Sequence, residues 1–235
     1  MLKRTQICTS TTEFAEARVV TFLNPYSLLK IFESKTNLDR FDKICIDGIA
    51  LKIFLEFVYR ETKIERLSFD FTSIANLVFE KAAANKEKGF ILGSDKVSND
   101  VFLEKITEMF PEIKLEGRSG YFDNDKEFTH FLSTLSDPMS AIKPDFIVIG
   151  MGAVKQEEAA ITLMNLGFEG RIYTCGGFIH QTAFSGGEYY PVWIDKCNLR
   201  FAYRMYKEPS TIRRYLIDYP RAFFLLTRNA AKFKN

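Results

Sequence analysis

The 235-residue sequence has few of the residues that mark metal centres, disulfide frameworks and membrane spans. It contains two histidines and four cysteines, none of the cysteines forms a CxxC pair, and no secretory signal opens the chain. This pattern argues against a zinc site and favours a reducing, cytoplasmic compartment. No apolar run reaches the roughly 18 residues of a transmembrane helix, so any membrane association is expected to be peripheral.

Several enzyme signatures are also missing. The sequence has no Walker lysine loop, no GxSxG elbow and no Cys-His pair at a recognisable spacing. The Gly150-Met151-Gly152 turn is not a dinucleotide fingerprint, because Lys155 stands where GxGxxG requires Gly or Ala. These absences lower the expectation of a nucleotide triphosphatase, an α/β-hydrolase or a dinucleotide-dependent oxidoreductase.

The charge is small overall but uneven along the chain. Net charge is +2, yet residues 196–235 carry ten Lys or Arg against two acids, and the first 195 residues carry −6. The tail interleaves basic residues with Tyr, Phe and Leu, which suits the surface of an anionic membrane. The alternative is an ordinary terminal helix with snorkelling arginines. Nucleic acid is not expected as a partner, because the remainder is acidic and no recognised nucleic-acid module is present.

Short apolar runs alternate with segments of helical period, which predicts an α/β fold. The runs expected to be strands are Val19 to Leu23, Lys43 to Ile46, Phe90 to Leu92, Phe146 to Ile149 and Arg171 to Thr174. The expected helices are Tyr26 to Ser34, Ile49 to Arg60, Ser73 to Asn85, Asp100 to Phe110, Lys126 to Ser133 and Gln156 to Leu166. The alternation predicts a Rossmann-like, mostly parallel sheet with helices on both faces. We expect this catalytic domain over residues 1–190, and a basic helical appendage over 191–235.

Ligands of parallel sheets bind at the carboxyl ends of the strands, so the loops that follow the strands are the candidate functional segments. In "GMGAVKQEE", Gly150 and Gly152 allow a close backbone approach, and the start of the next helix favours an anion such as a diphosphate. Lys155, Gln156 and Glu157 stand at that turn. The alternative is a tight strand-to-helix turn with a solvated Lys-Gln-Glu.

Two further strand ends carry polar residues. Asp47 follows a buried strand and can act as a general base on a substrate hydroxyl, or it can cap the helix that starts near Ile49. Asn24 before Pro25 can bind a sugar or base edge, or form the turn. His180, in the glycine-rich loop after the last strand, is the histidine with a candidate function, whereas His130 is expected to be a packing or surface residue.

In order, these loops resemble the WecG/TagA/CpsF glycosyltransferases of bacterial surface polysaccharide synthesis. The resemblance runs from Thr21 to Leu216 through the segments "TFLNPYS", "DGIALKIFL", "FILGSD", "PDFIVIGMGAVKQEEA", "CGGFIHQTA" and "LRFAYRMYKEPSTIRRYL". The sequence departs from the family pattern at Val154, where Pro is usual, at Ile179-His180 in place of Phe-Asp, at Tyr189 to Pro191, and at Phe22, where some members have Thr. These differences bear on the identity of the sugar more than on the reaction.

The resemblance implies an inverting, metal-independent transfer of a sugar, often of the N-acetylmannosamine type, from a UDP-sugar to a polyprenyl-diphosphate-linked acceptor. It implies no metal or other cofactor, and a peripheral location on the cytoplasmic face of the membrane. It places the general base at Asp47, substrate-binding amides at Asn24 and Gln156, and diphosphate- or lipid-contacting arginines at Arg204, Arg213 and Arg214. A catalytically silent membrane scaffold and a nucleotide-cofactor oxidoreductase are the alternatives, and the oligomeric state, a homo-oligomer included, stays open.

Overall fold

The computed structural model describes residues 3–59, 63–137, 139–184, 194, 197 and 199–229. Its centre is a six-stranded sheet in the order β2-β1-β6-β5-β3-β4, and every pairing is parallel. The strands are β1 (Val19–Leu23), β2 (Lys43–Ile46), β3 (Lys88–Gly93), β4 (Lys114–Arg118), β5 (Phe146–Gly150) and β6 (Arg171–Thr174). The predicted α/β class is confirmed, and all five predicted strands are present.

The sixth strand, β4, was not predicted from the sequence. It pairs only with β3, and its side chains are exposed or half-buried. An edge strand of this kind carries charged residues and lacks the apolar run that marks a buried strand. The sequence of β4, Lys-Leu-Glu-Gly-Arg, therefore contains no strand signal of its own.

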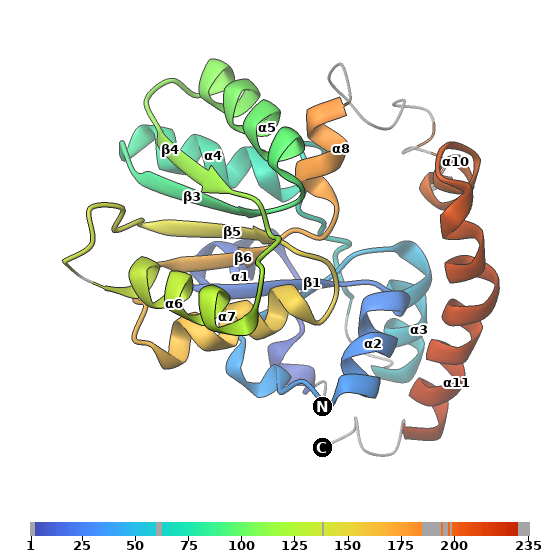
Figure 1. Ribbon diagram of the computed structural model, residues 1–235. Coiled ribbons are helices and arrows are strands. Elements are labelled where there is room, and N and C mark those ends of the chain that lie inside the picture. Colours follow the sequence, from blue (N-terminus) through green and yellow to red (C-terminus); the bar gives the residue numbers. More distant parts are fainter. Residues whose placement is uncertain are drawn as a thin grey trace.

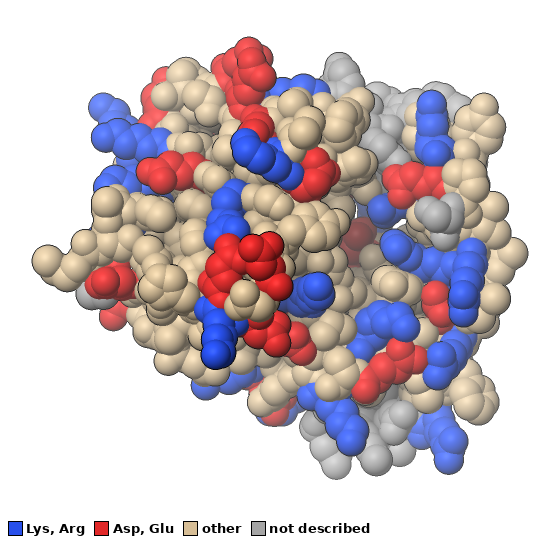
Figure 2. All heavy atoms as spheres, in the orientation of Figure 1, with Lys and Arg blue, Asp and Glu red and all other residues tan. Residues whose placement is uncertain are grey.

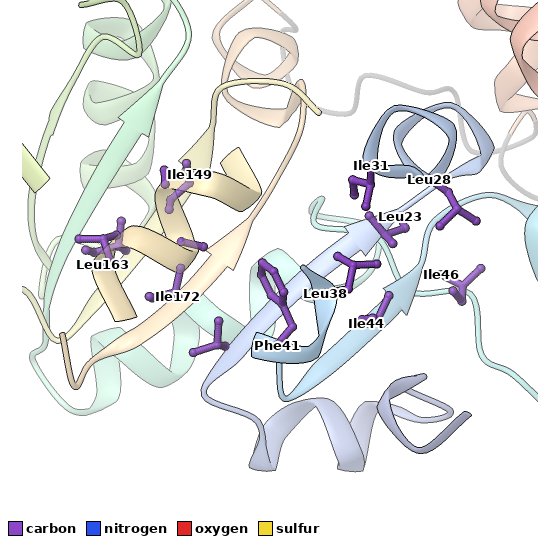
Figure 3. Close-up of a cluster of buried hydrophobic side chains, with 14 of the residues drawn as sticks. Leu23, Leu28, Ile31, Leu38, Phe41, Ile44, Ile46, Ile149, Leu163 and Ile172 are labelled. Atoms are coloured by element: carbon purple, nitrogen blue, oxygen red, sulfur yellow. The ribbon is translucent and has the colours of Figure 1, made fainter. Parts of the chain in front are cut away.

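Helices cover both faces of the sheet (Figure 1). On one face lie α2 (Pro25–Ser34), α3 (Ile49–Tyr59), α6 (Asp125–Ser136) and α7 (Lys155–Asn165). On the other lie α1 (Thr11–Glu16), α4 (Ile74–Ala84), α5 (Lys96–Met109) and α8 (Phe178–Phe184). Each group of helices closes a separate apolar cluster against the sheet, and Figure 3 shows part of the first cluster.

Two local details differ from the sequence-based expectation. The segment from Cys175 to Gly187 was expected to be a loop, but it contains helix α8. Helix α5 begins at Lys96, four residues before the predicted start at Asp100, and its N-cap is Asp95, which accepts from the backbone N–H of Ser98 at 3.0 Å. Ser94, the residue before this cap, has a positive φ of 57° and donates its backbone N–H to Gly150 O.

The basic tail is helical, as predicted, and folds back onto the sheet domain. It consists of α10 (Arg200–Lys207), the short 3-10 helix η3 (Pro209–Thr211), the π-helical segment η4 (Arg214–Asp218) and α11 (Tyr219–Asn229). In α11, Leu226 is fully buried within the first apolar cluster, and the Phe223 ring lies 5.3 Å from that of Phe54 in α3. The tail thus shares a core with the domain.

The predicted boundary between residues 190 and 191 lies outside the described residues, as does the Tyr189 to Pro191 departure from the family pattern. Among the helices that the structure describes, none is both long and apolar enough to cross a membrane.

Candidate active site

A pocket of about 920 Å³ opens at the carboxyl ends of the strands. In the sheet, the chain passes from β5 to its neighbour β6 in one direction and from β3 to its neighbour β4 in the opposite direction. A topological switch point therefore lies between the adjacent strands β5 and β3. The loops after all six strands line the pocket, and residues of α10, η4 and α11 close its far side. Figure 2 shows the hollow between the main body and the tail, with basic side chains over the tail helices.

Asp47 and Asn24 lie side by side on this pocket. A Cβ on Gly48 would stand 3.9 Å from the Asn24 Cβ, so the loops after β1 and β2 are in contact. Gly48, rather than Asp47, precedes α3, because Gly48 O accepts the first helical bond from the N–H of Lys52 at 3.2 Å. Asp47 is half-buried and lines the pocket, the position that a general base on a bound hydroxyl requires.

Asn24 combines the two alternatives that the sequence left open. Its side-chain oxygen accepts from the N–H of Ser27 at 3.0 Å, and Ser27 Oγ accepts from the N–H of Asn24 at 2.9 Å. This reciprocal pair caps α2, with Pro25 at its first position. The residue also lines the pocket. The cap therefore fixes the rotamer of a side chain that a ligand can reach.

Four basic and two acidic residues line the pocket. The basic ones include Arg204, whose guanidinium lies 3.5 Å from where a Cβ on Gly177 would be, and Arg214, whose Cζ lies 4.1 Å from the centre of the Tyr26 ring. The other two are Lys155 and Arg66. An excess of cations around a half-buried carboxylate suits a diphosphate-bearing substrate.

Arg66 was not identified from the sequence. It follows the segment after α3 and reaches the pocket because its backbone forms a parallel bridge with Ile46 at the end of β2. No local pattern marks it: "ERLSFD" contains neither a glycine turn nor a strand of its own. Only the tertiary pairing brings this arginine beside the Asp47 loop.

The glycine turn after β5 is a more internally bonded structure than the sequence indicated. Gly150 has no room for a side chain, since a Cβ would lie 2.7 Å from Ile179 Cδ1 and 2.9 Å from Cys175 Sγ. Gly152 has a φ of 82° and nothing within 4 Å of its Cβ position, so it faces open space. Gly150 thus allows close packing against α8, whereas the backbone at Gly152 is open for a ligand to approach.

Gln156 and Glu157 are both buried at this turn. Glu157 is fully buried and does not line the pocket, so the structure does not place it in contact with a substrate there. Its carboxylate accepts from the backbone N–H of Val154 at 2.8 Å, which removes one N–H from those that an anion could use. Burial raises the pKa of Glu157 above its ordinary value, although hydrogen bonds from Gln156 and Thr21 oppose this.

Comparison with known proteins identifies the family. The model of the "Glycosyl transferase WecG/TagA/CpsF family" matches residues 2–235. The chain belongs to this family. A relative from Shigella boydii, a UDP-Gal:alpha-D-GlcNAc-diphosphoundecaprenol beta-1,4-galactosyltransferase, is 38% identical over 204 residues, which cover 86% of this chain and 83% of the relative.

More distant relatives are named for the transfer of a different sugar. N-acetylglucosaminyldiphosphoundecaprenol N-acetyl-beta-D-mannosaminyltransferases from two Staphylococcus aureus strains are 28% identical over 52% of this chain and 46% of the relative (MRSA252), and 26% identical over 65% and 57% (MW2). The chain therefore spans about half the length of these two relatives. The predicted class, a glycosyltransferase of surface polysaccharide synthesis, is confirmed.

Besides Glu157, two predicted site residues of this glycosyltransferase, His180 and Arg213, lie outside the pocket lining. His180 is exposed on α8, where its Nδ1 lies 3.0 Å from Ser98 Oγ and its ring 4.9 Å from Phe184. Arg213 is exposed, one residue before the pocket-lining Arg214. Adjacent helical residues point in directions about 100° apart, which explains why only one of the two arginines faces inward.

Two tyrosines of the tail interact electrostatically with the candidate base, Asp47. Tyr215 and Tyr219 line the pocket with their ring centres 4.8 Å apart. Burial is the main cause that raises the pKa of both phenols, and the negative charge of Asp47 contributes to both shifts. Asp47 is thus close enough for its charge to act on residues of the tail.

One Asp-x-Asp sequence, the spacing of a divalent-metal motif, is present at Asp123-Asn124-Asp125. Asn124 caps α6 by accepting from the N–H groups of Lys126 and Glu127 at 3.1 and 3.0 Å. None of the three residues lines the pocket, and the described part of the chain contains no cluster of three potential metal ligands. Metal independence remains a prediction for this glycosyltransferase.

Proposed function

We propose that the protein transfers a hexose from a UDP-sugar to a sugar of the GlcNAc type on polyprenyl diphosphate, with inversion and without a metal ion. The acceptor is proposed by analogy with both groups of relatives, whose names share a diphosphoundecaprenol-linked substrate. Galactose is the first donor sugar to test, because the galactosyltransferase relative matches over most of both chains. The observation that carries the proposal is the half-buried Asp47 in a pocket where basic residues outnumber acids.

Asp47 takes the role of general base. Its carboxylate accepts the proton of the acceptor hydroxyl while that oxygen forms a bond to the anomeric carbon and the bond from that carbon to the UDP oxygen breaks. Because attack and departure occur on opposite sides of the carbon, the configuration inverts. Asn24, fixed by its helix cap, lies beside Asp47 and is suited to orient a sugar hydroxyl.

The leaving UDP carries the developing negative charge. Arg66, Arg204, Arg214 and Lys155 surround the pocket and can stabilise it in place of a divalent cation. Within the glycine turn, the donor is expected to meet the open face of Gly152 and the side chain of Lys155. The backbone N–H of Val154 is already bonded to Glu157 and takes no part.

The tail is proposed to hold the enzyme on the cytoplasmic face of an anionic membrane. Its exposed surface combines apolar side chains with basic ones: Tyr206, Leu216, Ile217 and Phe224 are all more than half exposed, and Arg213, Arg221 and Arg228 are also exposed. In α3, which packs against α11, Ile53 and Phe57 are 58% and 74% exposed. An exposed apolar surface with basic residues among it is typical of peripheral membrane attachment.

The test is UDP release with UDP-galactose, UDP-GlcNAc and UDP-ManNAc, each with a short-chain polyprenyl-diphospho-GlcNAc acceptor. Wild type should release UDP only when acceptor is present, and Asp47→Asn should reduce the rate by about 10²- to 10⁴-fold. EDTA should leave the wild-type rate unchanged. An unaltered rate in Asp47→Asn would remove Asp47 as the base. UDP binding without turnover of any donor would favour the scaffold alternative.

A further inference from the structure

Glu157 is a fully buried carboxylate for which the proposed reaction has no direct use. It accepts three hydrogen bonds from three parts of the chain. Oε2 accepts from the Val154 N–H at 2.8 Å, and Oε1 accepts from Gln156 Nε2 at 2.8 Å and from Thr21 Oγ1 at 3.0 Å. These donors belong to the β5–α7 turn, to α7 itself and to strand β1.

The hydrogen bonds leading to Glu157 have a fixed direction. Phe22 N–H can only donate, and it lies 3.2 Å from Thr174 Oγ1. The Thr174 hydroxyl lies 2.9 Å from that of Thr21. Thr21 Oγ1 donates to Glu157 Oε1, and because a hydroxyl has only one proton to donate, the Thr174 hydroxyl donates to Thr21. The carboxylate therefore terminates a chain of hydrogen bonds that joins the end of β6 and the middle of β1 to the turn after β5.

The same carboxylate determines which way the Gln156 amide points. Gln156 Nε2 donates to Glu157, while Gln156 Oε1 accepts from the Gly176 N–H at 3.0 Å. Reversing the amide would place its oxygen against the carboxylate and its NH₂ against another N–H. Gln156 lines the pocket, and among the described residues no acceptor takes its second Nε2 hydrogen. Gly177, the next residue after Gly176, lies beneath the Arg204 guanidinium.

We infer that Glu157 is a positioning residue: it fixes the Gln156 amide so that the pocket receives an N–H donor, directed at a substrate oxygen, and never the amide oxygen. The inference rests on the proposed function for the identity of that substrate. The same bonds hold the Gly176 loop, and with it the surface on which Arg204 lies, in register with the turn after β5.

The direct test uses the side-chain amides and needs no substrate. The sequence has three glutamines, Gln6, Gln156 and Gln181, so selective ¹⁵N-glutamine labelling gives three pairs of side-chain resonances. In Glu157→Asp, which shortens the carboxylate without adding an amide, the Gln156 pair should shift and its exchange with water should accelerate. The resonances of the Gln6 side-chain amide, which donates to Leu38 O and Phe41 O outside the Glu157 network, should not change. An unchanged Gln156 pair would overturn the inference.

The kinetic test compares Glu157→Gln with Glu158→Gln, which removes the same charge from the exposed neighbouring residue. Because Glu157→Gln places a second amide against three donors, kcat/KM should fall by about a hundredfold, mostly in kcat. Glu158→Gln should stay within about twofold of wild type. Equal kcat values for the two variants would overturn the inference.

A reciprocal exchange separates positioning from folding. The double variant Q156E/E157Q keeps the charge and the bond between the two side chains but presents a carboxylate oxygen to the pocket. Its melting temperature should recover toward the wild-type value, while kcat/KM stays as low as in Glu157→Gln. Recovery of kcat/KM would refute the need for an N–H donor. Failure of wild type to bind UDP would instead refute the proposed function, and the amide resonances would still test the inference.

Discussion

Replacing Leu226 with Ala should release the tail from the sheet domain. Leu226 lies in α11, is fully buried and belongs to the apolar cluster built by α2, α3 and the sheet. Arg204 and Arg214 reach the pocket from segments that precede α11. If α11 holds the tail in place, loss of one buried side chain outside the pocket lining should remove both arginines from the site.

The contacts of the tail differ widely in expected strength. A buried Leu→Ala change costs about 2–5 kcal/mol, including the cavity that it leaves. The Arg221–Glu33 ion pair, at 3.0 Å, has side chains that are 60% and 32% exposed, so solvent screening limits it to about 0–1 kcal/mol. The Arg214–Tyr26 cation–π contact contributes about 0.5–1 kcal/mol. Leu226 is therefore expected to contribute more than either of these two polar contacts.

Hydrogen exchange is the appropriate assay, because it reports the opening of each element separately. A loss of 2 kcal/mol or more should accelerate exchange of the α11 amides by about 30-fold or more, since 1.4 kcal/mol corresponds to a factor of ten. Amides of β1 and β5 should keep their protection. With a soluble acceptor and no membrane, kcat/KM should fall as the docked fraction falls.

Phe224→Ala is the matched control, since Phe224 lies on the same helix and is 64% exposed. It should change the free energy of unfolding by no more than about 0.5 kcal/mol. Unchanged α11 exchange in Leu226→Ala, or equal acceleration in β1 and β5, would refute the idea that the tail opens as a unit. Truncation of the tail tests less, because it also exposes the core surface that Leu226 covers.

Three further outcomes are expected. In Gly93→Ala the new Cβ would lie 2.4 Å from Gly150 O, so urea denaturation should show a loss of about 3 kcal/mol or more, while Gly167→Ala, with a φ of 86° but open space, should lose only about 1. Hydrogen bonds from Ser98 lower the pKa of Asp95 from 3.8 to about 2, so this carboxylate stabilises the fold above about pH 4, and its contribution is lost as the pH falls through about 2. The urea midpoint of wild type should therefore drop more between pH 4 and pH 2 than the urea midpoint of Asp95→Asn. Equal drops in the two proteins would contradict the assignment. Arg214→Lys should lower kcat/KM by about tenfold, because a lysine cannot stack flat on the α2 tyrosine and form a bidentate contact with a phosphate; an unchanged value would place Arg214 outside the reaction.

Local sequence determined the elements and most of the loops of the site. The alternation of apolar strands and amphipathic helices is a short-range pattern, and it predicted five of the strands and the helices between them. The loops that follow those strands must meet at one edge of a parallel sheet, which is why Asn24, Asp47 and Gln156 could be grouped before the fold was seen. Strand β4 was missed because an edge strand needs no apolar run.

Tertiary structure alone decided which neighbours face the pocket. Lys155, Gln156 and Glu157 are consecutive, yet only the first two line the pocket, Lys155 as an exposed residue and Gln156 as a buried one. Glu157 is fully buried outside the pocket lining, where Thr21 and Val154 donate to its carboxylate. Arg66 reaches the site only through its bridge to Ile46. Contacts between segments distant in the chain leave no periodic signal in either segment. The sequence by itself therefore determined which strands are followed by the polar loops of the site. The packing of distant segments decided which side chains of those loops can touch a substrate.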